Sequence, residues 1–425
     1  MTLLASPLDP AARENDGKSR SLRALNAVNF FLADVRDGLG PFLGVFLIGQ
    51  GWGTETIGLV MTVGGIAGML ATTPLGILAD ATRAKRFVIG LCAALVVAAS
   101  LLILFAPTVG WVAASQVATG IAGAAIGPAL AGLTLGLVGQ AGLAHQLGRN
   151  EAWNHGGNVV AAALAGLLGY RWGLPAVFAL MTAMALGSIA SVLLVRPEDI
   201  DHDTARGLER AGDGAAEAPS SFAVLLRCPP LLVLAGTLML FHFGNGALLP
   251  LLGQQVASDG SADPAVYTAA TIIIAQLTMI PVALGAARTA ERHGYFVVML
   301  AALIALPVRA VLAALWASPW AVVPVQVLDG VGAGLLGVAV PGLVARILRG
   351  TGHVNAGLGA VMTVQGVGAS LSPLVAGWIA ARYGFTAAYL SLGAMAALAL
   401  VAWMALSRGP GAADGARDAT ARRRP

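Results

Sequence analysis

Long apolar segments separated by short polar breaks restrict what this chain can fold into. The segment at 87–107, FVIGLCAALVVAASLLILFAP, contains no charged residue. Across the chain 57% of residues are hydrophobic and 11% are charged, whereas soluble domains contain about 25% charged residues. A soluble protein of this composition would expose large apolar patches. The sequence therefore predicts a membrane protein with several spans.

Twelve segments of this kind are candidate transmembrane spans. Their backbone polar groups would find no water in lipid, so we expect each span to be a helix. Most are long enough to cross a hydrocarbon core of about 30 Å. The predicted spans are 25–49, 56–78, 87–107, 110–138, 152–170, 173–195, 229–253, 265–286, 295–316, 319–345, 355–380 and 385–406. The predicted fold class is an all-α membrane protein.

Basic residues are distributed unevenly between the two sets of loops. The tails, the central linker and the loops on their side contain 21 of the 25 lysines and arginines. The opposite loops contain only Arg171 and Arg382, and the remaining two, Arg36 and Arg309, lie within predicted spans. Basic loops remain on the cytoplasmic side. We therefore expect a bacterial inner-membrane protein with both termini in the cytoplasm.

The same pattern divides the chain into five parts. Residues 1–24 form a polar cytoplasmic tail, and 25–195 form the first six-helix bundle. The charged linker at 196–228 has no apolar periodicity, which predicts a flexible cytoplasmic connector. A second six-helix bundle at 229–406 precedes a disordered tail at 407–425.

The two bundles resemble each other in sequence. The fourth span contains QVATGIAGAAIGPALAGL from Gln116, and the tenth contains QVLDGVGAGLLGVAVPGL from Gln326. A looser alignment of the first and seventh spans places Asp34 opposite His242. Transporters are commonly built from such repeats, with the substrate site at their interface.

The loop after the second span reads GILADATRAKR from Gly76. With twelve spans in two repeats, this loop resembles the major facilitator superfamily (MFS) of transporters. The resemblance implies that Gly76 allows close helix approach and that Asp80 locks an inner gate. It also implies that Arg83, Lys85 and Arg86 form the basic part of that gate. Spans 1, 4, 7 and 10 would then line a central cavity.

This chain also departs from the patterns of that superfamily. Gln116 stands where proton-coupled exporters have an arginine, and the second copy of the loop, from Gly285, lacks a matching aspartate. The sequence therefore does not assign a sub-branch.

Five charged residues lie within the predicted spans: Asp34, Arg36, Asp37, Arg309 and Asp329. A charge at this depth is costly and usually faces a partner or a cavity. If each arginine is paired, one carboxylate remains to take a proton or bind a cation. The alternative is that these acids only join helices, with Asp329 pairing to Arg309.

These residues define the predicted site. The candidates for proton coupling are Asp34, Asp37, Asp329 and His242, and His242 is equally compatible with simple packing. Arg309 is expected to form a structural ion pair. Polar side chains within spans can hydrogen-bond a solute, and the alternative is that they only join helices. Seven such residues are the candidates for substrate binding. They are Arg36, Asn245, Asn154, Asn158, Gln116, Gln326 and Gln365.

We expect a secondary transporter that moves a small organic solute by alternating access, coupled to protons rather than sodium, and that acts in efflux. A proton-coupled importer of a polar or anionic metabolite is the alternative, and a non-transporting membrane receptor or scaffold is a second. The chain lacks GxxxxGK[ST] and any catalytic or metal-ligand spacing, so we expect no enzyme activity, ATP use, cofactor or metal. The expected partners are the solute, protons and the lipid bilayer, and we expect no nucleic acid. We also expect the protein to be a monomer.

Overall fold

The computed structural model of this protein describes residues 10–35, 39–206, 227–316, 318–349 and 354–407. These residues form helices, and no strand occurs among them. The helices are α1 (Pro10–Val35), α2 (Pro41–Gly49), α3 (Thr54–Ala81), α4 (Lys85–Phe105), α5 (Val109–Trp172), α6 (Pro175–Leu194), η1 (Pro197–Asp199), η2 (Thr204–Arg206), α8 (Pro229–Gly246), α9 (Leu248–Asp259), α10 (Pro264–His293), α11 (Tyr295–Leu315), η3 (Pro319–Ala321), α12 (Val322–Ile347) and α13 (Val354–Leu406).

Proline and glycine set many of these boundaries. Proline stands in the first turn of α2, α6, α8 and α10. An N–H at this position would have no acceptor within the helix, so its absence in proline costs no hydrogen bond. Two long helices, α5 and α13, bend at Gly139 (φ 65°) and Gly384 (φ 84°). A residue that has a side chain rarely adopts such positive φ angles, so glycine permits each bend. Each of these helices therefore contains two straight runs.

The described chain differs from the predicted spans at its beginning. The prediction of one helix over 25–49 is wrong, because α1 ends at Val35 and α2 begins at Pro41. Gly40 has φ 48° and Pro41 lacks a donor N–H, so an unbroken helix cannot pass this point. Helix α1 also begins at Pro10, within the predicted tail. The tail at 408–425 lies outside the described residues.

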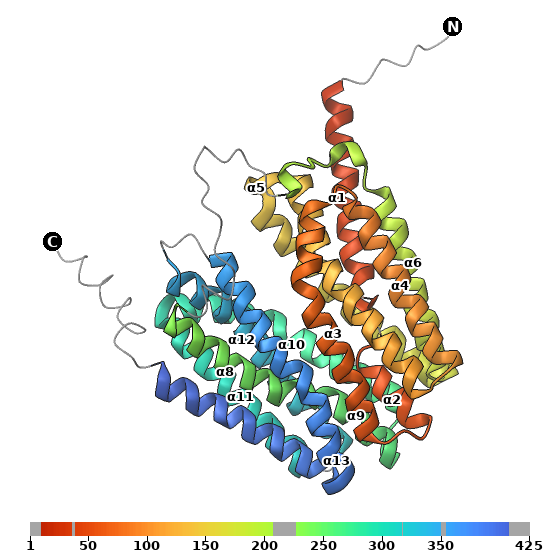
Figure 1. Ribbon diagram of the computed structural model, residues 1–425, viewed down its shortest axis with the longest axis vertical. Helices are drawn as coiled ribbons and strands as arrows, with labels where there is room; N and C mark the ends of the chain where they lie inside the picture. The colour runs from red at the N-terminus through yellow and green to blue at the C-terminus, as the bar shows by residue number, and fades with distance from the viewer. Residues whose placement is uncertain (1–9, 36–38, 207–226, 317, 350–353, 408–425) are drawn as a thin grey trace, which may run out of the picture.

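Nine helical segments of the described chain are long and apolar enough to cross a membrane. The count of twelve spans stays a prediction. Buried apolar side chains form two clusters, one at 24–205 joined by Ala265 and Ala269, the other at 231–403. We call the corresponding groups of helices the first and second halves. Figure 1 shows them as two bundles that run in different directions and meet near α2, α3, α9 and α13.

Small residues bring equivalent helices together in both halves. In the first, a Cβ added at Gly120 of α5 would overlap the carbonyl oxygen of Gly64 on α3. In the second, a Cβ added at Gly330 of α12 would lie 2.5 Å from the carbonyl oxygen of Ala275 on α10. Close backbone approach of this kind joins helices in membranes.

The halves join mainly at one end. We call it the far end, and the linker end is the end where the linker leaves α6 and returns to α8. At the far end, α3 contacts α13: Thr54 Oγ1 donates to the Gly377 carbonyl (3.0 Å), and Arg382 pairs with Glu55 (3.2 Å). A Cβ added at Gly58 would overlap the carbonyl oxygen of Pro373.

A second seam runs between α5 and α10. A Cβ added at Gly169 would lie 2.5 Å from Ala265, and one added at Gly166 would lie 2.6 Å from Ala269. Further toward the linker end, His155 Nδ1 hydrogen-bonds Gln276 Oε1 at 2.7 Å. The contacts of this seam therefore extend from the far end to about mid-length of both helices.

Candidate functional site

A buried arginine organises polar residues of the second half. Arg309 on α11 is fully buried, and its Nη1 donates to Asp329 Oδ1 (2.6 Å) and to Asn245 Oδ1 (2.5 Å). Its Nη2 lies 3.5 Å from Gln326 Oε1. The cluster therefore joins α8, α11 and α12 through one guanidinium group. Three residues of the predicted site, Asn245, Gln326 and Asp329, meet there.

The Arg309–Asp329 pair leaves little charge unbalanced. The Asp329 side chain is 18% exposed, against 1% for Arg309. A buried cation is tolerated when a carboxylate and further acceptors surround it. Nε of Arg309 and Nε2 of Gln326 are buried without a hydrogen-bond partner among the described residues. The cluster is thus neutral overall and retains two free donors.

His242 lies three residues before Asn245 on α8. Its ring meets Phe241 edge-on, with 5.4 Å between the ring centroids. Residues three apart share a helix face, so His242 lies on the side of α8 that carries Asn245.

Asp34 lies on α1 and is partly buried. It follows Phe30 by one turn, and the carbonyl oxygen of Phe30 is so close to Gly157 of α5 that an added Cβ would overlap it. Arg36 and Asp37, the other two predicted site residues of this stretch, lie outside the described residues.

A cavity of about 200 Å³ lies in the first half, between α1 and the two straight runs of α5. Its apolar wall includes Leu32, Ile126, Leu130 and Leu147. Its remaining lining residues are Asn29, Gly127, Ala131, Thr134, Asn150, Glu151 and Asn154. The predicted substrate residue Asn154 is therefore a cavity residue.

Buried amides hold the polar wall of this cavity in place. Gln146 Nε2 donates to Asn26 Oδ1 (3.0 Å) and to Asn150 Oδ1 (2.9 Å). Asn150 Nδ2 donates to Thr134 Oγ1 at 2.9 Å. A buried polar group is costly unless it is hydrogen-bonded, so this chain of bonds fixes α1 against both runs of α5.

The other predicted substrate residues are dispersed. Asn158 donates to Asn154 Oδ1 at 3.3 Å, within one helix. Gln116 packs against Gly64 of α3, because a Cβ added at that glycine would lie 2.9 Å from the Gln116 Cβ. Gln365 lies partly buried on α13. The structure therefore gathers some candidates into two clusters and leaves Gln116 and Gln365 apart from them.

The predicted gating residues surround the short loop between α3 and α4: Gly76 and Asp80 lie on α3, Arg83 lies in the loop, and Lys85 and Arg86 lie on α4. Lys85 is buried, and its Nζ donates to the carbonyl oxygens of Ala79 (2.6 Å) and Thr82 (3.2 Å). Arg86 donates to the carbonyl oxygens of Val192 and Leu193 at the end of α6. These bonds attach the loop to its own half.

Two further predictions concern residues beside this loop. A Cβ added at Gly76 would lie 4.0 Å from Pro128 Cγ, an ordinary contact, so no described atom approaches Gly76 closely in this conformer, and the role of Gly76 in close helix approach stays a prediction. The side chain of Asp80 lies outside the described residues.

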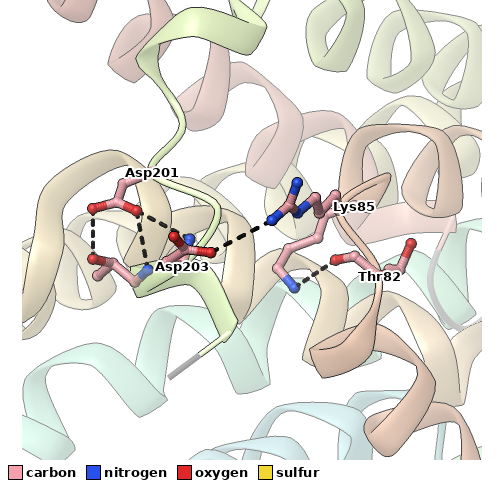
Figure 2. A network of polar contacts seen from close by, with 6 residues as sticks. Thr82, Lys85, Asp201 and Asp203 are labelled. Atoms are coloured by element: carbon pink, nitrogen blue, oxygen red, sulfur yellow. Dashed lines mark hydrogen bonds and ion pairs between the residues drawn. The ribbon is translucent and has the colours of Figure 1, made fainter. Parts of the chain in front are cut away.

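The first part of the linker docks on this loop and on α5. Arg83 Nη2 lies 3.8 Å from Asp203 Oδ1, and the Asp201 N–H donates to the Gly136 carbonyl (2.9 Å). Figure 2 shows Asp201 and Asp203 of the linker on the same side of the molecule as Thr82 and Lys85. Ile200 and Ala205 are buried against α5. The prediction of a flexible linker is therefore wrong for residues 196–206, and residues 207–226 lie outside the described chain.

Asp201 stabilises the turn of this docked segment. Its carboxylate accepts hydrogen bonds from the Thr204 hydroxyl and from the N–H groups of Asp203 and Thr204. The Thr204 hydroxyl bond is the main cause that lowers the pKa of Asp201. A lowered pKa means that the turn is stabilised at neutral pH, and this stabilisation is lost as the pH falls through that pKa.

Several residues of these clusters escaped prediction from the sequence. Asn26 and Asn29 are three residues apart and Gln146 is four residues before Asn150, so helical spacing is a weak signal for these three, whereas Gln276 is an isolated amide. Position on the face of α1 that meets α5 is the signal that would have found Asn26 and Asn29. No cluster of three or more His, Cys, Asp or Glu with metal-binding geometry occurs in the described ranges.

Comparison with known proteins identifies the family. A family model described as the MFS_1 like family matches residues 22–355. The chain is 42% identical over 378 residues to an uncharacterized MFS-type transporter of Mycobacterium tuberculosis, found in strains CDC 1551 and H37Rv. That alignment covers 89% of this chain and 90% of the relative. The chain therefore belongs to the MFS_1 like family and is a multi-pass membrane transporter of the MFS type.

Solved structures show the same fold. The nucleoside transporter NupG superposes with a TM-score of 0.73 at 16% identity, covering 92% of this chain and 99% of NupG. A bacterial homologue of the human lysosomal transporter Spinster, in an inward-facing and unoccupied conformation, gives 0.71 at 16% identity, covering 92% and 97%. The MFS fold is thus shown, as the sequence resemblance implied.

Proposed function

We propose that this protein is a proton-coupled secondary transporter that exports a small organic solute by alternating access. The observation that carries the proposal is the one-ended junction of the halves. Helices α3 and α13 interlock at the far end, and the α5–α10 seam extends to His155 and Gln276. A transporter of this type rocks its halves about a site near the membrane midplane.

The distribution of basic residues supports an orientation for this conformer. It places the linker end in the cytoplasm, so the far end faces outward. The halves are then closed to the outside and diverge toward the cytoplasm (Figure 1). The protein would lie in a bacterial inner membrane, and it would act as a monomer, because each chain contains both halves.

Asp34 is the leading candidate for the proton-coupling group. Asp329 already forms an ion pair with Arg309 at 2.6 Å within the second half. Asp34 is partly buried on α1, a span that the MFS resemblance places beside the central cavity, whose access changes as the halves move. His242 beside the Arg309 cluster and Asp37 on the same stretch remain further candidates.

Proton-coupled import of a polar metabolite is the second candidate function. The amides that line the cavity favour it, because Asn side chains hydrogen-bond polar solutes. The two functions use the same site and differ in the direction of net solute movement.

Substrate-evoked proton movement tests the proposal. Purified protein in liposomes that contain a pH-sensitive dye would be exposed to amphiphilic amines, alcohols and organic acids. We expect at least one solute to evoke an uncoupler-sensitive pH change in wild type and in Glu291→Gln, a control at an exposed residue of α10. Asp34→Asn should abolish the pH change. Proton movement that persists in Asp34→Asn would reassign the coupling role, and none with any solute would refute proton coupling.

A further inference from the structure

Among the described residues, one charged side chain lines the cavity between α1 and α5. That residue is Glu151, which precedes Asn154 by nearly one helical turn. It is exposed, so a hydrated solute can reach its carboxylate. The neighbouring Arg149 is not part of the lining. The formal charge of the lining is therefore negative.

Hydrogen bonds already made by the amides determine what they can still offer a ligand. Asn150 uses its nitrogen on Thr134 and its oxygen on Gln146. Asn29 Nδ2 donates to the Leu25 carbonyl at 2.8 Å, which leaves Oδ1 as an acceptor. Asn154 Oδ1 accepts from Asn158, which leaves its Nδ2 as a donor. Together with the Glu151 carboxylate, the wall offers mainly acceptors.

The buried arginine of the second half does not supply a competing positive charge. Arg309 is fully buried and paired with Asp329, so its charge is balanced within its own cluster. The Glu151 carboxylate can pair with an ammonium group and accept its N–H groups, and such charge-assisted hydrogen bonds are stronger than neutral ones. An anionic solute would have to approach Glu151 without a compensating cation in the lining.

Size further limits the solute. The cavity volume of about 200 Å³ lies below the roughly 300–1,000 Å³ typical of drug-sized pockets. Its lining combines leucine and isoleucine side chains with polar groups. A matching solute is compact and has an apolar body with a charged end.

We infer that this cavity binds a small organic cation, with an ammonium group on the Glu151 carboxylate and an apolar body against Leu32, Ile126 and Leu130. Asn29 accepts a second N–H, and Asn154 donates to any acceptor on the solute. This inference rests on the proposed function, because it specifies the substrate class of that transporter.

Three probes with the same phenyl group test the inference: 2-phenylethylammonium, 2-phenylethanol and phenylacetate. Their binding to the full chain in detergent would be measured by isothermal titration calorimetry. We expect only the ammonium compound to bind with measurable heat. Glu151→Gln should weaken this binding by about tenfold or more, as expected for loss of one charge-assisted hydrogen bond. Glu151→Asp keeps the charge and should retain most of the affinity, and Glu291→Gln should leave it unchanged.

Three results would overturn the inference: preferential binding of phenylacetate, equal binding of all three probes, or an unchanged affinity in Glu151→Gln. The absence of binding of the ammonium compound up to millimolar concentration would also overturn it. Proton movement in liposomes separates this outcome from failure of the proposed function. If phenylacetate alone evoked proton flux, the proposed transport function would stand and the inference of a cationic substrate would be wrong. If 2-phenylethylammonium bound but no solute evoked proton flux, the cation site would stand and proton coupling would be wrong.

Discussion

At the scale of single residues, two ion pairs of the same kind differ in their surroundings. Arg309 and Asp329 are 1% and 18% exposed, whereas Arg382 and Glu55 are 49% and 50% exposed. Removing one partner of a buried pair leaves an uncompensated buried charge. When one partner of an exposed pair is removed, water solvates the charge that remains. The two pairs should therefore contribute very differently to stability.

Arg309→Met should lower the free energy of unfolding by about 3–5 kcal/mol, because Asp329, Asn245 and Gln326 lose a shared donor. Arg382→Gln should lower it by less than about 1 kcal/mol. Unfolding by SDS in mixed micelles would measure both. The double variant Arg309→Met with Asp329→Asn should regain part of the loss, and equal losses for the two single variants would contradict this account.

Sequence reasoning found the charged residues of the Arg309 cluster and some amides, such as Asn154 and Asn245, but it missed Glu151 and several amides of the cavity region. Arg309 and Asp329 stand out because ionisable groups are rare within apolar spans. Asn29 and Gln276 do not stand out, since an amide is less costly in a helix and is common in loops. Their roles depend on which face of α1 or α10 meets α5, and this is fixed only by packing. Asn154 was predicted because a second amide follows it by one turn.

At the scale of helices, glycine determines how closely the two halves approach. Gly58 of α3 and Gly377 of α13 allow backbone contact at the far end, because a Cβ at either would overlap a carbonyl oxygen of the other helix. The sequence predicted most helices from their apolar length, but it merged α1 with α2. Helix length follows from composition, whereas breaks depend on single residues such as Gly40 and Pro41.

Gly58→Ala should weaken the closed far end, because its methyl group cannot fit while Pro373 stays in place. Disulfide formation between cysteines that replace Glu55 and Arg382, in a chain without Cys92 and Cys228, would report this closure. We expect the cross-linked fraction to fall severalfold. Gly337→Ala is the matched control, since no atom lies within 4 Å of its added Cβ. An unchanged fraction in Gly58→Ala would show that the seam tolerates the methyl group.

At the scale of the whole molecule, the two halves behave as bodies with separate cores. The first half is stabilised by the amide network of Gln146 and by the docked segment 196–206, and the second by the Arg309 cluster. Because each half is fixed internally, we expect movement between states to be concentrated at the α3–α13 and α5–α10 seams. The His155–Gln276 hydrogen bond lies at the inner limit of one seam.

The central claim is that these halves alternate between opening at one end and at the other. Spin labels at residues 55 and 382 would report the far end, and labels at exposed His145 and Arg288 would report the linker end. Double electron–electron resonance would then give both distance distributions as pH and 2-phenylethylammonium are varied. We predict opposite changes, with the far-end distance increasing in the same population in which the linker-end distance decreases. Distances that stay fixed under every condition, or that increase together, would contradict alternating access.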